Sequence, residues 1–349
     1  MSSSQDLNQF GYRFIGPVVT AFFDKINLSL KAQADSNNLF FLAREGYFLQ
    51  ELYKDYLQIL DESDKPAGSY ILCSRAFLFK LALTDESMIP FTLKHHYKGL
   101  LRDFICRRYG FNGTDLNRIV NELPHIAKSL GAEVKLPSQS DKLIKIMTEI
   151  SVLFRSELSH KRELYLSYLH KNGFKAENVS VVDIGFTGTI QTLLAMITKQ
   201  KITGHYMVTT NKAINNEQCT YHGHLAANQV FGEGYPLIDR SLYLESILTA
   251  PHGQVIDIFD INGQIQFGYG TKTMAQHHFS VLEQIVKGAK QYMADTLPDS
   301  IQLTADEIPE YYAGLVSDPE CFPAGVRSIL EVDDHISGFG ILNPTRLFG

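Results

Sequence analysis

The first ninety residues show apolar patterns that switch between helix and strand. Residues 12–33 carry apolar side chains at helical spacing, with Pro17 at a position that the first turn of a helix tolerates. The short apolar run 39–43 predicts a buried strand, 46–60 a helix, and 69–73 a second strand. Because helices alternate with strands, we expect a mainly parallel sheet flanked by helices.

The middle of the chain has a different pattern. Residues 91–173 lack strand signals and carry helical periodicity, including an amphipathic stretch, 141–171, that predicts one long helix. We therefore expect an all-helical insertion or cap. It would divide the chain into a first part of an α/β core (1–90), the insertion (91–173) and a second part of the core (174–349).

Strand patterns return in the second half of the chain. The β-branched run 179–183 predicts a buried strand, and 202–210 predicts another. Residues 256–267 alternate around Asn262-Gly263, the dipeptide most typical of a two-residue hairpin turn. The expected fold is therefore α/β, with a mainly parallel sheet, a helical insertion, a late β-hairpin and C-terminal helices.

The most informative segment follows the strand at 179–183. Gly185 and Gly188 permit backbone conformations that a side chain would block, and the next helix is predicted to start near Thr189. Its first turn would direct free N–H groups and the positive end of the helix dipole into the turn, where the Thr187 and Thr189 hydroxyls add donors. An anionic group fits such a loop, although a strand-to-helix connection with an N-capping threonine explains the bare pattern equally well.

Polar side chains follow each of the three best predicted strands. In an open parallel sheet the carboxyl ends of the strands meet at one edge, so these side chains should converge. Arginine binds phosphate oxygens through paired hydrogen bonds, and a carboxylate can orient ribose hydroxyls, bind Mg²⁺ or accept a proton. The pattern favours a site for a sugar with more than one phosphate, although a surface ion pair is the simpler explanation for each residue alone. The residues are Arg44 and Glu45, Ser74 and Arg75, and Asp183 with the 187–189 loop.

Other polar side chains are weaker candidates. Glu245 and His252, on a short predicted helix and the turn after it, could face the same cleft, although ordinary solvated placement explains them equally well. Gln191 follows the loop on its helix. His222 and His224 have strand spacing that puts both imidazoles on one face, but no third ligand is evident, so a non-metal role is the better interpretation.

The remaining charged clusters have less support. The adjacent pairs at 95–96 and 277–278 would diverge on a helix, and the Asp-Asp-His run at 333–335 could bind a metal. Arg155, Lys161 and Arg162 on the long predicted helix could reach an anionic donor or a lipid phosphate. A solvated helix face explains these three cations better.

Composition excludes several classes of protein. A hydrophobic content of 44% over 349 residues supports a sizeable core, and a net charge of −6 with a pI near 6.1 gives no overall basic field for nucleic acid. The first residues lack the features of a signal peptide, and no apolar run reaches the length of a membrane span. We expect a cytoplasmic protein with reduced thiols, because the cysteines are far apart and form no CxxC pair. They are Cys73, Cys106, Cys219 and Cys321.

Four blocks of sequence carry a family resemblance through their order and spacing. They are Phe40-Phe-Leu-Ala-Arg-Glu-Gly-Tyr-Phe-Leu49, Cys73-Ser-Arg-Ala76, Val182-Asp-Ile-Gly-Phe-Thr-Gly-Thr-Ile-Gln191, and Leu244-Glu245 through Ala250-Pro251. In this arrangement the chain resembles the glycan phosphoribosyltransferase domain that usually accompanies a haloacid-dehalogenase-type phosphatase domain in bacterial polysaccharide ribofuranosyltransferases. The resemblance extends over about 16–344.

The resemblance implies a reaction. 5-Phosphoribose would pass from phosphoribosyl pyrophosphate to a hydroxyl of a lipid-linked surface glycan, such as an O-antigen or a capsule, with inversion and release of pyrophosphate. Mg²⁺ would neutralise the charge on the leaving group. A separate phosphatase would then remove the 5-phosphate, and the lipid-linked acceptor would draw the enzyme to the inner face of the cytoplasmic membrane.

Motif and strand-end position together assign roles to residues. Glu45 is the first choice for the base that takes the acceptor's proton, and Asp183 is the second. Asp183 would also contact the ribose hydroxyls or Mg²⁺. The other assignments are Thr187, Gly188 and Thr189 for the 5-phosphate, Arg44 and Arg75 for the pyrophosphate, Ser74 and Gly185 for the donor phosphates in general, and Gln191, Glu245 and His252 for the pocket or the acceptor.

The chain departs from related patterns at two places. The family usually has Arg-Asp-Gly where this chain has Arg44-Glu45-Gly46, which keeps the carboxylate but lengthens its reach. Phosphoribosyltransferases of nucleotide synthesis carry two acids before their Thr-Gly loop, whereas Asp183 stands alone. Two alternatives stay open: a non-catalytic phosphosugar-binding module and, with less support, a phosphohydrolase of haloacid-dehalogenase type.

Overall fold

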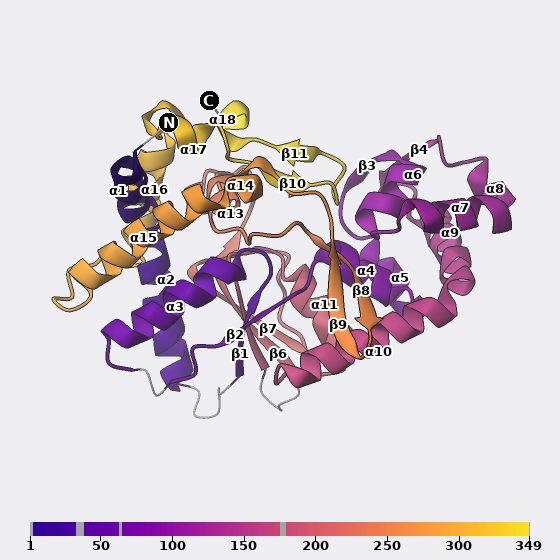
Figure 1. Ribbon diagram of the computed structural model, residues 1–349, viewed down its shortest axis with the longest axis horizontal. Coiled ribbons are helices and arrows are strands. Elements are labelled where there is room, and N and C mark those ends of the chain that lie inside the picture. The colour runs from indigo at the N-terminus through magenta and orange to yellow at the C-terminus, as the bar shows by residue number, and fades with distance from the viewer. Residues whose placement is uncertain (1–2, 33–37, 63–64, 175–178, 349) are drawn as a thin grey trace.

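A five-stranded sheet forms the centre of the computed structural model, which describes residues 3–32, 38–62, 65–174 and 179–348. Every neighbouring pair of strands is parallel, which confirms the predicted α/β class and parallel sheet. The labelled strands β1, β2, β6 and β7 lie together between the surrounding helices (Figure 1). The chain moves from β1 outward to β2 and returns to β5 on the other side of β1, so the strand order reverses between β1 and β5. Ligands of such sheets bind at this reversal, beyond the carboxyl ends of the strands. The order is β2 (Ser69–Ile71), β1 (Asn38–Leu42), β5 (Val179–Asp183), β6 (Ile202–Thr210) and β7 (Cys219–Gln229).

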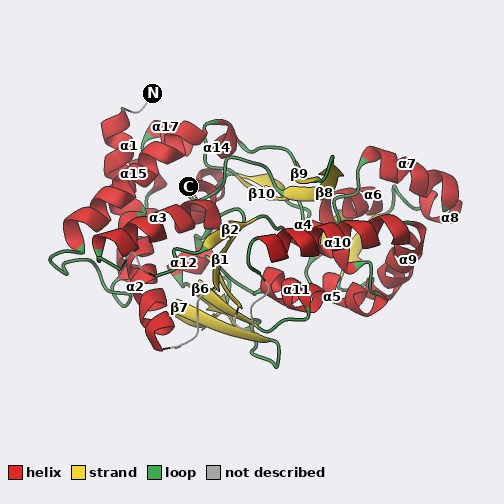
Figure 2. Ribbon diagram, turned by 60° about the horizontal axis from the view of Figure 1, so that its bottom comes forward, coloured by secondary structure: helices red, strands yellow, loops and turns green. Residues whose placement is uncertain are grey.

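Helices cover both faces of this sheet (Figure 2). Along β1, Phe41 packs with the helices of one face and Phe40 with those of the other, because successive side chains of a strand point to opposite sides. A strand buried on both faces is apolar throughout, which explains the continuous apolar run at 39–43. One face carries α2 (Gly16–Ala32), α3 (Gly46–Ile59) and α15 (Phe279–Thr296), and the other α4 (Arg75–Ala82), α10 (Arg155–Lys171) and α11 (Thr189–Thr198).

The helix predicted at 12–33 is part of a pair of helices. α1 (Ser4–Phe14) begins with a capping box in which the side chains of Ser3 and Asp6 each accept a hydrogen bond from the other residue's backbone N–H. α2 follows after a single residue, and Gln33 lies outside the described residues. The separate helix α1 was not predicted, because its N-terminal residues are polar and show no apolar periodicity.

α1 crosses α15 in direct backbone contact. A Cβ atom at Gly11 would collide with the carbonyl oxygen of Ile285, and one at Gly288 would collide with the carbonyl oxygen of Asn8. Only glycine allows two helices to approach this closely. The crossing thus joins two helices that are separated by most of the sequence.

The insertion is not all-helical, which corrects the prediction for 91–173. β3 (Tyr97–Leu100) and β4 (Glu133–Leu136) pair in an antiparallel ribbon. Val134 and Leu136 are buried while their neighbours are exposed, but four alternating residues are too short a run to stand out from helical periodicity. The long helix predicted at 141–171 is also divided, because the backbone leaves the helical range at the buried Phe154, between α9 (Ser140–Leu153) and α10.

The hairpin predicted at 256–267 is confirmed. β8 (Val255–Ile261) and β9 (Gln264–Tyr269) pair antiparallel, and Asn262 and Gly263 both have positive φ angles, 54° and 79°, as a tight hairpin turn requires. A second hairpin, β10 (Val332–Asp334) with β11 (Gly340–Leu342), was not predicted, since each strand has only three residues.

Short elements complete the fold. No helix within the described residues is long and apolar enough to cross a membrane. The other helices are α5 (Ile89–Thr92), α6 (Leu101–Asp103), α7 (Gly113–Glu122), α8 (Pro124–Ala127), α12 (Pro236–Asp239), α13 (Leu242–Ile247), α14 (Met274–His277), α16 (Ile308–Val316), α17 (Ala324–Arg327) and α18 (Pro344–Phe348).

Candidate functional site

A cleft of about 470 Å³ lies beyond the carboxyl ends of β1, β2 and β5. This volume suits a small-molecule ligand. Its wall includes residues from the insertion, from α13 and from the β10–β11 hairpin, so the whole length of the chain contributes to it. The structure brings together every predicted strand-end residue here: Arg44, Glu45, Ser74, Arg75, Asp183, Gly185, Thr187, Gly188 and Thr189.

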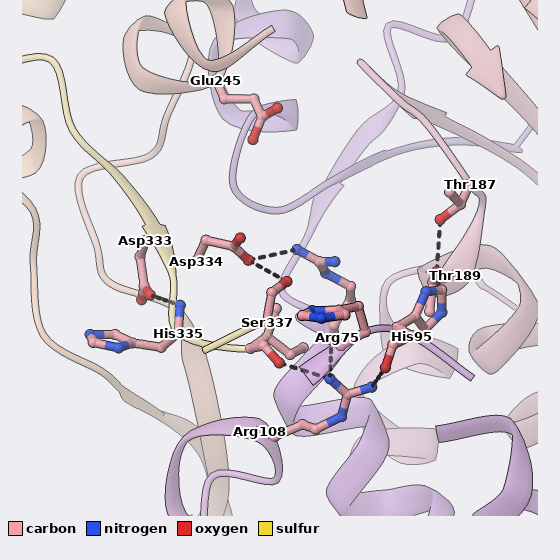
Figure 3. Close-up of polar contacts among 12 residues, drawn as sticks. Arg75, His95, Arg108, Thr187, Thr189, Glu245, Asp333, Asp334, His335 and Ser337 are labelled. Atoms are coloured by element: carbon pink, nitrogen blue, oxygen red, sulfur yellow. Dashed lines mark hydrogen bonds and ion pairs between the residues drawn. The ribbon is translucent and has the colours of Figure 1, made fainter. Parts of the chain in front are cut away.

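The loop before α11 has hydrogen-bond donors to offer a ligand. Gly188 adopts a positive φ angle of 66°, and a Cβ atom there would collide with the Tyr221 ring. No side chain among the described residues caps the first turn of α11, so the N-capping threonine of the alternative interpretation is not present. The Thr187 and Thr189 hydroxyls lie 2.9 Å apart (Figure 3). The turn therefore combines free N–H groups, a helix dipole and two hydroxyls.

His95 lies next to this loop, a position that the sequence around His95 did not indicate. Its Nε2 lies 3.1 Å from Thr189 Oγ1, and its ring lines the cleft. Burial and the charges of Arg75 and Arg108 lower the pKa of His95 to about 4, so the ring is neutral near pH 7. The pair at 95–96 does diverge: His95 faces the cleft and His96 is exposed.

Carboxyl groups gather on another part of the cleft wall. Burial and the nearby charge of Glu45 raise the pKa of Asp183 well above its ordinary value, although the N–H of Ile184 donates to its Oδ1 at 2.8 Å. Burial and Glu45 also raise the pKa of Glu245 to about 7, while Ser241 donates a hydrogen bond of 2.9 Å to it. These groups can hold a proton near neutral pH or respond to a bound cation.

Two arginines frame the β10–β11 hairpin (Figure 3). Nη2 of Arg75 lies 4.0 Å from Oδ1 of Asp334, which also accepts a hydrogen bond of 2.8 Å from Ser337. Burial raises the pKa of Asp334 even beside this arginine. The guanidinium of Arg108 is buried and donates to main-chain carbonyls, including that of Ile336 at 2.8 Å, which fastens the hairpin to the insertion.

Several predicted residues already have structural partners. The Ser74 hydroxyl accepts from the N–H of Phe77 and donates to the carbonyl of Val255, so it caps α4 although it lines the cleft. Gln191 does not reach the cleft. Its amide nitrogen donates to the carbonyls of Ile202 and Thr220, deep in the core.

His252 lies outside the cleft lining. Its Nε2 is 2.9 Å from the Tyr70 hydroxyl, and its ring lies against that of Tyr269. Burial lowers the pKa of His252. Of the three residues predicted for the pocket or the acceptor, Glu245 alone lines the cleft.

A metal site made by protein side chains alone is not found among the described residues. Asp333 accepts a hydrogen bond from the N–H of His335, whose ring nitrogen contacts Arg107, so the Asp-Asp-His run at 333–335 forms no chelate. Mg²⁺ commonly binds through one or two carboxylates and the phosphates of a substrate. Asp183 and the neighbouring Glu45, both in the cleft lining, fit that mode of binding.

The pair at 222 and 224 has a third imidazole beside it. His205 on β6 lies with its Nδ1 2.9 Å from Nε2 of His224, and their rings stack at 5.1 Å. Burial lowers the pKa of His205 to about 3 and that of His224 to about 4. Within the described residues the three rings do not form a group that could hold a metal ion.

The solvated-face interpretation of the α10 cations is confirmed for the exposed Arg155 and is wrong for the buried Lys161 and the half-buried Arg162. Lys161 is buried and donates to both carboxylate oxygens of Asp257, at 2.7 and 2.8 Å. Arg162 donates to the carbonyl of Ile197 at 3.1 Å, and Arg155 pairs with Glu86 at 3.3 Å. None of the three lines the cleft in the described structure.

Comparisons with protein-family models and with curated proteins find no match to this sequence.

Proposed function

We propose that this protein is a glycosyltransferase that moves 5-phosphoribose from phosphoribosyl pyrophosphate to a hydroxyl of a lipid-linked glycan. The observation that carries the proposal is the meeting of three features in one cleft: the free first turn of α11, the two strand-end arginines, and the carboxylates Glu45 and Asp183. A donor with two separate phosphate groups on a sugar needs all three kinds of group.

Each group has a place in the reaction. The loop at 187–189 binds the 5-phosphate, and Arg44 and Arg75 bind the pyrophosphate. The acceptor oxygen attacks the anomeric carbon as the bond to pyrophosphate breaks, and the configuration inverts. Glu45 takes the proton of the acceptor hydroxyl, which restores the balance of charge on the new glycosidic oxygen.

Asp183 is placed to orient the ribose hydroxyls and to share a divalent cation with the substrate. Its pKa is raised by burial and, to a smaller extent, by repulsion from Glu45 and Glu245, and a bound cation would relieve that repulsion. When bound, Mg²⁺ supplies charge neutralisation for the departing pyrophosphate.

Thermal unfolding tests the donor without knowledge of the acceptor. We expect phosphoribosyl pyrophosphate with Mg²⁺ to raise the melting temperature, since a ligand at a hundred times its Kd adds about 2.7 kcal/mol to the free energy of unfolding. Ribose 5-phosphate and a panel of nucleotide sugars are the comparison ligands. Stabilisation by a nucleotide sugar alone would overturn the donor assignment.

Two arginine variants provide a matched comparison. Arg75→Ala should abolish most of the stabilisation by the donor, because Arg75 lines the cleft. Arg102→Ala should leave it unchanged, because Arg102 is exposed on α6 and does not line the cleft. Equal loss in both variants would indicate non-specific attraction of the anion.

A further inference from the structure

His95 is placed where it can respond to a ligand in the 187–189 loop. A chain of close contacts runs from His95 Nε2 to Thr189 Oγ1 at 3.1 Å and on to Thr187 Oγ1 at 2.9 Å (Figure 3). All three residues line the same cleft. A change in the protonation of the ring therefore reaches the hydroxyls directly.

The position of the imidazole is fixed from several sides. Its ring stacks with Phe79 of α4 and meets Phe91 of α5 edge to face, both at 6.5 Å between centroids. Its carbonyl accepts a hydrogen bond of 3.2 Å from the buried guanidinium of Arg108. A ring held in this way cannot turn aside when a ligand arrives.

Four positive charges act on His95. They come from Arg75 on α4, Arg108 on the π-helical turn Phe104–Arg108, Lys212 after β6, and the adjacent Lys94. Burial and these cations lower the pKa of the ring, and the neutral form has a single N–H donor. An anion bound among these cations would raise the pKa of His95, because an opposite charge at 4–6 Å shifts a pKa by roughly 1 to 3.

We propose that His95 positions the Thr189 hydroxyl for phosphate binding and takes up a proton from solvent when a phosphomonoester dianion binds at Thr187 and Thr189. The inference rests on the proposed function, since it assigns the 5-phosphate to this loop. The protonated ring donates from Nε2 to Thr189 Oγ1, which leaves the Thr189 hydroxyl proton to point at the phosphate. The site then prefers a dianionic monoester over an unphosphorylated sugar.

Calorimetric titration with ribose 5-phosphate tests this directly. At pH 7, the heat of binding in two buffers of different ionisation enthalpy gives the number of protons taken up. We expect clear net uptake for the wild type and a loss of that uptake in His95→Gln, with affinity at least several-fold weaker. Between pH 6 and pH 8 the wild-type affinity, relative to that of His95→Gln at the same pH, should fall by up to about tenfold, as expected for one linked proton whose pKa rises from about 4 to roughly 7 at most.

His96→Gln is the matched control. His96 is exposed, its ring stacks on Phe339 at 6.2 Å, and it does not line the cleft. The same chemical change there should leave both proton uptake and affinity unchanged. Unribosylated pyrophosphate is the control ligand, and it should bind without the His95-dependent uptake.

The outcomes separate this inference from the proposed function. Binding of ribose 5-phosphate with no proton uptake, or with equal uptake in the wild type and His95→Gln, overturns the role of His95 and leaves the donor assignment standing. Failure of ribose 5-phosphate and phosphoribosyl pyrophosphate to bind overturns both. If His95→Gln does not fold, the C2–H resonance of His95 in the wild type decides the matter: saturating ribose 5-phosphate must raise its titration midpoint, and an unmoved midpoint refutes the proposal.

Discussion

Two groups of buried charges in this molecule are built in opposite ways. Between α10 and β8, Lys161 makes two hydrogen bonds with the carboxylate of Asp257, and Lys80 lies 3.6 Å from the same carboxylate. Burial lowers the pKa of Lys80, while the hydrogen bonds and charges of its partners raise that of Lys161 in spite of burial. Opposite charges here join the insertion to the hairpin and to α4.

In the cleft, like charges are brought together instead. Burial and, after it, the charge of Glu45 raise the pKa of both Asp183 and Glu245, and Arg75 opposes these shifts only in part. Such an arrangement costs stability unless a ligand or a cation relieves it. In this protein, paired opposite charges hold neighbouring elements together, whereas clustered carboxylates favour a ligand-binding site.

Glu45→Gln should give the largest effect of these variants, and the effect should be on the turnover rate and not on the free energy of unfolding. Loss of a general base lowers turnover by a factor of about 10² to 10⁴. Removing one of the crowded charges should leave the free energy of unfolding unchanged or slightly higher. Release of pyrophosphate and urea unfolding measure the two quantities, and Glu45→Asp, which retains the carboxylate, should keep part of the activity. A wild-type turnover rate in Glu45→Gln would refute the assignment of Glu45 as the general base.

Asp257→Asn should lower the free energy of unfolding and leave donor binding nearly unchanged, in contrast to Glu45→Gln. It removes the buried carboxylate that Lys80 and Lys161 share and leaves Lys161 with only the partly exposed Glu157, a change that costs about 3–5 kcal/mol in the free energy of unfolding. Urea unfolding at pH 7 measures the loss. Donor binding, measured on the folded fraction, should change little, because Asp257 does not line the cleft. A loss below about 1 kcal/mol would contradict the view that this cluster is a joint.

Glu245→Gln should stabilise the protein, and only at higher pH. The pKa of Glu245 is raised from its ordinary value to about 7, so its favourable contribution is complete below pH 4.5 and is lost as pH rises through 7. The variant never carries the charge. We expect a gain of about 1–3 kcal/mol at pH 8, given partial exposure, and almost none at pH 4.5. A gain that is the same at both pH values would refute the charge explanation.

Glu157→Gln should have the smallest effect. Glu157 contacts Lys161 at 3.1 Å, but its side chain is 43% exposed and the lysine keeps Asp257 as a partner. Exposed ion pairs contribute about 0–1 kcal/mol, so the loss should stay below that limit in urea unfolding. A loss as large as that of Asp257→Asn would show that the lysine, and not its buried partner, determines the strength of the cluster.

The sequence predicted the sheet and the strand-end half of the cleft because both depend on local signals. Apolar runs at 39–43 and 179–183 mark strands buried on two faces, and polar residues after them meet at one edge by geometry alone. The break at Phe154 and the ribbon β3–β4 were missed, since packing inside the insertion overrides the helical periodicity there.

The other half of the cleft depends on distant contacts. His95 and Asp334 reach it because Arg108 fastens the segment around His95 to the carbonyl of Ile336, and no local pattern encodes that contact. His205 joins the histidine pair on β7 only because β6 and β7 are neighbours in register. Gln191 was misplaced for a related reason: its position on α11 turns it into the core, where the carbonyl of Ile202 accepts its hydrogen bond.

The glycine crossing of α1 and α15 bears on the order in which the chain folds. Joining positions separated by most of the sequence requires a long loop to close, so we expect the contact between α1 and α15 to form later than the pairing of β1 with β2. Until it forms, the apolar sides of both helices face water. A newly made chain is therefore most prone to self-association in that interval, and the meeting of these two helices brings it to an end.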